Sequence, residues 1–172
     1  MSKRQLHTFL AALSKTELQE QINDLYDRFK NVKEFYDFSF NPNEDRRFKE
    51  AKLKISREYF PEKGKKAKKR RSVAQKHIIH LLKLEADPVK IADLMLYNIE
   101  VAQTYTLESP LKQESFYKSM LTAYRKALEY IHEQYLLNDF KQRIDLIHEM
   151  THRQNWMNKE GFTMAVRELI PA

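Results

Sequence analysis

The residues whose types and spacing come nearest to a reaction centre run from His148 to His152 and read His-Glu-Met-Thr-His. Two histidines one helical turn apart can bind the same Zn²⁺ ion, and the glutamate between them can act as a general base on metal-bound water. Asp145 lies three residues before His148 and would share that helical surface. The spacing therefore gives one hypothesis, a metal site formed by Asp145, His148, Glu149 and His152.

The surroundings of this motif favour a solvent-facing histidine pair over a hydrolase. Asn155 and Asn158 stand where the extended zinc-protease motif has a glycine and a third histidine. The apolar residues of the same segment mark a buried face that leaves both histidines out, namely Phe140, Ile144, Ile147 and Thr151. We interpret His148 and His152 as lying on the wetter face beside it. An adventitious or regulatory metal site and a true hydrolase are the alternatives.

A second feature is the uneven distribution of positive charge. The chain has 172 residues, with 31 Lys and Arg against 24 Asp and Glu, for a formal net charge of +7. Seven of those basic residues lie in the segment 63–71, which contains no acid, so the rest of the chain is neutral. Such a block attracts polyanions, because each phosphate that it neutralises releases a counterion. It has no aromatic, Asn or Gln side chain, so it could position a nucleic acid without reading its bases.

This basic connector gives the leading functional hypothesis, a non-enzymatic protein that binds nucleic acid without a cofactor. Its expected phosphate contacts are Lys65, Lys66, Lys68, Lys69, Arg70 and Arg71. A solvated loop and a docking segment for an acidic protein are the alternatives. A different class of function, a protein-interaction scaffold, rests on nine of the 20 aromatic residues, which lie between Tyr26 and Phe60. We expect most of them in a core, with a peptide-accepting groove as the alternative.

Composition excludes several other classes of site. The chain has no cysteine, which excludes disulfides, thiolate zinc sites and cysteine nucleophiles. Its two glycines, Gly64 and Gly161, lie too far apart for a glycine-rich phosphate loop. No apolar run approaches the roughly 20 residues of a membrane span, and the apolar residues after Met1 have helical spacing. We therefore expect a cytoplasmic protein with no membrane partner.

The elements that position these residues are predicted to be helices. Apolar spacings of three and four predict an all-α protein of about eight antiparallel helices, as a bundle or short α-solenoid-like array, in a single domain over 1–172. Ser14 and Glu17 form a capping box, and the apolar stripe after it predicts one unbroken helix to about residue 38. The segment 73–86 has apolar residues nearly all round, which predicts burial on several sides. Asp87-Pro88 should begin the next helix, and Gly161 should separate the last, 162–169.

Three stretches carry a resemblance to a known family: MSKRQL, SKTELQEQINDLYDRFKNVKEFYDFSFNPNED and KISREYFP. They resemble an uncharacterised bacterial family, a domain of unknown function found in short cytoplasmic proteins. The likeness covers the first 60 residues or so well and the rest loosely. It implies a bacterial, helical, cytoplasmic protein, and it implies no activity and no catalytic residues.

Overall fold

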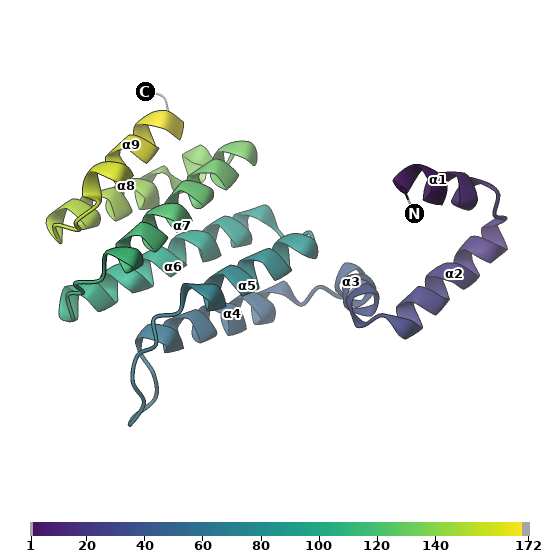
Figure 1. Ribbon diagram of the computed structural model, residues 1–172, viewed down its shortest axis with the longest axis horizontal. Helices are drawn as coiled ribbons and strands as arrows, with labels where there is room; N and C mark the ends of the chain where they lie inside the picture. Colours follow the sequence, from purple (N-terminus) through teal and green to yellow (C-terminus); the bar gives the residue numbers. More distant parts are fainter. Residues whose placement is uncertain (1, 170–172) are drawn as a thin grey trace. The chain divides into compact units, whose positions relative to one another are not determined.

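The computed structural model describes residues 2–169, and all regular secondary structure in that range is helical (Figure 1). The nine helices of the described range confirm the all-α prediction, with one more than expected: α1 Lys3–Ala11, α2 Lys15–Arg28, α3 Lys30–Phe40, α4 Glu44–Tyr59, α5 Arg71–Lys83, α6 Pro88–Glu108, α7 Glu114–Glu133, α8 Leu137–Arg153 and α9 Lys159–Leu169. The chain divides into two compact units, with the boundary between Asn43 and Glu44. The single domain over 1–172 stays a prediction, and each unit is described by itself.

The first unit contains two helices with complete capping boxes. In α2 the Ser14 hydroxyl accepts a hydrogen bond from the Glu17 backbone N–H at 3.3 Å, and a Glu17 carboxylate oxygen accepts one from the Ser14 N–H at 2.7 Å. Ser2 and Gln5 make the same reciprocal pair at the start of α1. These contacts satisfy backbone donors that have no partner inside the helix, and the box predicted at Ser14 is confirmed.

The expectation of one unbroken helix to residue 38 is wrong. Phe29 is extended, with φ −118° and ψ 109°, and it separates α2 from α3. The chain turns back at this residue, as shown by a hydrogen bond that the Tyr26 hydroxyl donates to Asp37 Oδ1 at 2.7 Å. On a straight helix, residues 11 apart would be separated by about 16 Å. A single extended residue keeps the apolar spacing on both sides, so the periodicity alone did not reveal the break.

The second unit is built around α6, which packs against α4, α5, α7 and α8 (Figure 1). Asp87 caps α6 as predicted, with its Oδ1 accepting a hydrogen bond from the Val89 N–H at 2.8 Å. The burial on several sides expected of 73–86 belongs instead to α6. In α5, Ile79 and Leu82 are 42% and 37% exposed, because helices cover only part of its surface. Within the described residues, no helix combines the length and the apolar character that a membrane crossing requires.

The last three helices close the second unit. Trp156 is buried, and its ring lies 6.2, 5.2 and 5.7 Å from the rings of Phe116, Tyr117 and Phe162. Gly161 does not separate a final helix but lies in the first turn of α9. A Cβ atom there would meet Leu121 Cδ2 of α7 at 2.5 Å, so this glycine permits close packing of α7 and α9. The predicted buried face of α8 is confirmed: Phe140, Ile144, Ile147 and Thr151.

Candidate functional site

The end of the basic connector, residues 63–71, is tied to α4 through Glu58. Arg70 donates from Nε and Nη2 to the two carboxylate oxygens of Glu58, at 2.9 and 2.7 Å, and its backbone N–H adds a third hydrogen bond at 3.2 Å. Glu58 is only 9% exposed, and the Arg70 hydrogen bonds lower the pKa of its carboxyl group and raise the pKa of Arg70. Arg70 is therefore committed to a structural ion pair.

Lys69 is the second attachment point of the connector. Its Nζ lies 5.4 Å from the centre of the Tyr105 ring on α6, a cation–π contact. Its backbone N–H donates to the Glu58 carbonyl oxygen at 2.9 Å, and its φ of 54° places it in the left-handed region. Of the six expected phosphate contacts, the structure thus uses Lys69 and Arg70 to hold the connector against α4 and α6.

The other expected contacts are exposed to solvent. Lys65 makes a loose ion pair with Glu62 at 3.3 Å, with both side chains more than half exposed. Lys66, Lys68 and Arg71 are exposed and make no ion pair within the described part of the chain, and Arg71 begins α5. The six residues therefore form two groups, one fixed to the body and one directed to solvent.

The acid-free region is longer than the connector itself. No Asp or Glu occurs from Lys63 to Lys83, so α5 adds Lys76, Lys83 and two histidines to the same region. Burial lowers the pKa of His77, and the nearby charges of Lys54 on α4 and Lys76 lower it further. This extension was not predicted from the sequence, although the lack of acidic residues as far as residue 83 could have indicated it.

The histidine pair of α8 is brought together by a residue that sequence analysis missed. His148 Nε2 and His152 Nε2 lie 2.9 and 2.8 Å from Thr163 Oγ1 of α9, and the two ring centres are 4.7 Å apart. One hydroxyl has one proton, so with both rings neutral Thr163 can donate to only one of them. At least one of the two imidazoles therefore carries its proton on Nε2 and donates to Thr163 Oγ1. Thr163 lies on another helix, and nothing in its spacing marked it.

The two carboxylates of the proposed metal set do not complete this cluster. Asp145 and Glu149 are both exposed, and no group of three or more His, Cys, Asp or Glu side chains in residues 2–169 is arranged to hold a metal ion. Burial lowers the pKa of His148, and His152 lowers it further. Asp145, Glu149 and Glu160 oppose that shift through their charges. Within residues 2–169 the histidine pair therefore lacks a third ligand of the zinc-protease kind.

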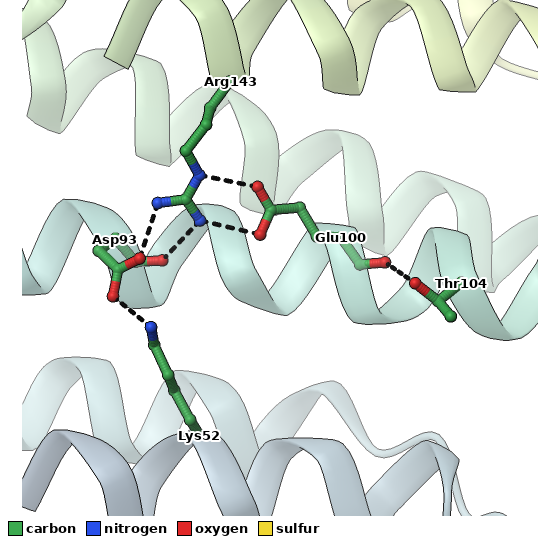
Figure 2. A network of polar contacts seen from close by, with 5 residues as sticks. All are labelled: Lys52, Asp93, Glu100, Thr104 and Arg143. Atoms are coloured by element: carbon green, nitrogen blue, oxygen red, sulfur yellow. Dashed lines mark hydrogen bonds and ion pairs between the residues drawn. The ribbon is translucent and has the colours of Figure 1, made fainter. Parts of the chain in front are cut away.

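A third charged cluster joins α4, α6 and α8. Arg143 donates to both carboxylate oxygens of Glu100 at 2.8 Å and to Asp93 Oδ1 at 2.7 Å. Figure 2 shows Arg143 and Lys52 approaching Asp93 from opposite sides, and Lys52 Nζ lies 2.5 Å from Asp93 Oδ2. Two cations meet two carboxylates, so this cluster has no charge left for a ligand and holds the three helices together.

Comparison with known proteins places the chain in a family. A family model described as "Family of unknown function (DUF6155)" matches residues 1–169. The chain belongs to DUF6155. The match extends well beyond the stretches that carried the resemblance, so the basic connector and the histidine pair of this DUF6155 protein lie within the family's span. No curated protein matches the chain. No solved structure matches it either.

Proposed function

We propose that this DUF6155 protein is a non-enzymatic nucleic-acid-binding protein that engages the phosphate backbone through its basic connector and α5. The observation that carries the proposal is the acid-free stretch from Lys63 to Lys83, whose exposed members include Lys66, Lys68 and Arg71. Unpaired cations that lie close together bind phosphates by releasing condensed counterions. Residues 63–83 hold nine Lys and Arg, and outside them the chain has 22 Lys and Arg against 24 Asp and Glu, so the attraction is concentrated in this region.

The attachment of the connector supports the proposal. Lys69 and Arg70 fix the chain just before Arg71, through Tyr105 and Glu58. A segment that is already held near the body loses less conformational freedom on binding than a free tail would. The division of roles follows: Lys69 and Arg70 hold the connector, and Lys65, Lys66, Lys68 and Arg71 contact phosphates.

The same composition sets the expected specificity. The connector has no side chain suited to reading base edges, so we expect binding that varies little with sequence and weakens steeply with salt. A solvated loop would show no binding. If the partner is instead an acidic protein, that protein would compete with nucleic acid for the same lysines. A neutral protein would not compete.

The test is titration of a labelled duplex with three proteins at about 50 mM salt, where electrostatic binding is strong. The proteins are the wild type, the variant Lys66→Gln/Lys68→Gln/Arg71→Gln, and a control that removes the same charge elsewhere, Lys112→Gln/Lys141→Gln/Arg153→Gln. We expect the first variant to bind at least about tenfold more weakly than the control. Absence of binding by the wild type, or an equal loss in the control, would overturn the proposal.

A second candidate function, the protein-interaction scaffold, is favoured by the first unit. Neither α1 nor α2 contains a buried residue. Five large apolar side chains of α1, α2 and the residue that follows α2 are 42–50% exposed: Leu6, Phe9, Ile22, Leu25 and Phe29. Exposed apolar faces of this kind occur at protein contacts. We expect Ile22→Ser/Leu25→Ser to lose a partner that the wild type retains after purification. A partner held equally by both proteins would exclude this surface.

A further inference from the structure

A cavity of about 180 Å³ lies between α5, α6 and α7. Five apolar side chains form most of its wall: Ile78, Ile79, Leu82, Met95 and Ala123. An engineered apolar cavity of about 150 Å³ holds a benzene molecule, so this one has room for a single aromatic ring with a substituent. Because Ile79 and Leu82 remain partly exposed, the cavity is open to solvent on the α5 side.

One buried polar group in this wall lacks a partner. Asn98 of α6 lines the cavity and is 2% exposed, and its Oδ1 accepts no hydrogen bond. Tyr59 and Asn158 are the other residues in the described range with such an atom, and neither lines the cavity. Buried acceptors without partners are rare because desolvation is costly, so each one calls for an explanation. Asn98 Oδ1 is closed off from water as the side chain stands, so a ligand that brings an N–H or O–H group would supply the missing donor when the amide turns the oxygen toward the cavity.

The two charged residues that line the cavity are both positive. Arg71 begins α5 and Lys126 lies on α7, and both side chains are exposed. No acid lines the cavity. An apolar wall, an unpaired amide oxygen and two cations at solvent-exposed positions are together complementary to one kind of molecule, a small amphiphilic anion.

We propose that this cavity binds a small aromatic carboxylate that carries a hydroxyl or N–H donor. The ring lies among the five apolar side chains, the donor bonds Asn98 Oδ1 once the Asn98 amide has turned that oxygen toward the cavity, and the carboxylate faces Arg71 and Lys126. The ligand is a small molecule, so this site stands whether or not the connector binds nucleic acid. The two sites share only Arg71, which is therefore left unchanged in the tests below.

The ligand chemistry is tested by NMR titration of the full chain with three probes of similar size. We use 4-hydroxybenzoate, benzoate, which lacks the hydroxyl group, and 4-hydroxybenzyl alcohol, which lacks the charge. We expect saturable shifts of the Ile78, Ile79 and Leu82 methyl signals, with 4-hydroxybenzoate binding about fivefold more tightly than either other probe. Absence of saturable shifts with all three probes up to about 5 mM would overturn the proposal.

Variants separate the three parts of the site. Lys126→Gln should weaken 4-hydroxybenzoate about fivefold and leave the neutral alcohol unchanged. Asn98→Leu should make 4-hydroxybenzoate and benzoate bind equally. Ala123→Leu fills the cavity without changing a charge and should abolish binding of all three probes.

Lys141→Gln on α8 is the charge control and should leave every affinity unchanged. Binding that survives Ala123→Leu would show that the probes bind elsewhere and would overturn the proposal. If Asn98→Leu does not fold, the Lys126→Gln and Ala123→Leu results still decide the matter. The result of these titrations does not decide the nucleic-acid proposal, because that proposal is tested by duplex binding to the connector lysines.

Discussion

The charged cluster around Arg143 and the basic connector contain the same residue types arranged to opposite effect. Around Arg143, each charge meets an opposite charge within 2.8 Å, and three helices are joined as a result. In the connector, Lys66, Lys68 and Arg71 have no such partner among the described residues. The comparison teaches that charge matching, more than charge density, separates a structural cluster from a candidate binding site. Arg70 belongs with the structural group because its Nε and Nη2 both donate to the Glu58 carboxylate.

The largest expected effect comes from breaking the matched cluster. Arg143→Ala leaves Glu100 partly buried without its ion-pair partner and leaves Asp93 with Lys52 alone. Removing one member of a fully buried pair costs about 3–5 kcal/mol, and because these side chains are about one-third exposed, screening reduces the expected loss to about 2 kcal/mol. Urea unfolding measures it, with Lys118→Ala, which breaks an exposed pair with Glu114, as the control. Equal midpoints for the two variants would contradict the structural role of the cluster.

A smaller effect is expected where the connector joins α4. Arg70→Gln should lower the urea midpoint by less than Arg143→Ala, and it should weaken duplex binding by less than Lys66→Gln does. Lys66→Gln should leave the urea midpoint nearly unchanged. The Arg70 hydrogen bonds lower the pKa of Glu58, so the stabilisation is present above the ordinary pKa of a glutamate. It is lost as pH falls through the lowered value. The difference between wild type and Arg70→Gln should therefore shrink in acid, and a constant difference would contradict it.

The smallest effect concerns the two histidines that contact Thr163, because their contribution to the free energy of unfolding depends on pH. The pKa of His148 is lowered from its ordinary value of 6.5 when the protein folds. The unfolded chain then binds more protons near that pH, so the free energy of unfolding falls as pH drops below about 7. His148→Gln should make stability less dependent on pH between about 5 and 7, as measured by thermal unfolding. His77 has the same direction of shift and should leave a residual slope. An unchanged slope would contradict the lowered pKa.

Features set by neighbouring residues were predictable from the sequence. The capping box of Ser14 and Glu17 and the Asp87-Pro88 start of α6 depend on contacts within three residues. The buried face of α8 followed from its apolar period. The charge block was also evident, because it needs only a count along the chain.

Features that depend on distant contacts were not predictable. The break at Phe29 is associated with the contact between Tyr26 and Asp37, and the histidine cluster needs Thr163 from another helix. Which connector residues are fixed is decided by Glu58 and Tyr105, which lie on α4 and α6. Likewise, the exposed side of α5 depends on which helices pack against it. The spacing of its apolar residues does not predict those neighbours.

The central claim is that the unpaired cations of the connector bind phosphate. Its most direct test is the salt dependence of duplex affinity, because the slope counts the phosphates neutralised. We predict a slope of magnitude about 3–5 for the wild type, reduced by about 2–3 in Lys66→Gln/Lys68→Gln/Arg71→Gln. The slope should be unchanged in Lys112→Gln/Lys141→Gln/Arg153→Gln. A slope near zero, or the same reduction in both triple variants, would contradict the account.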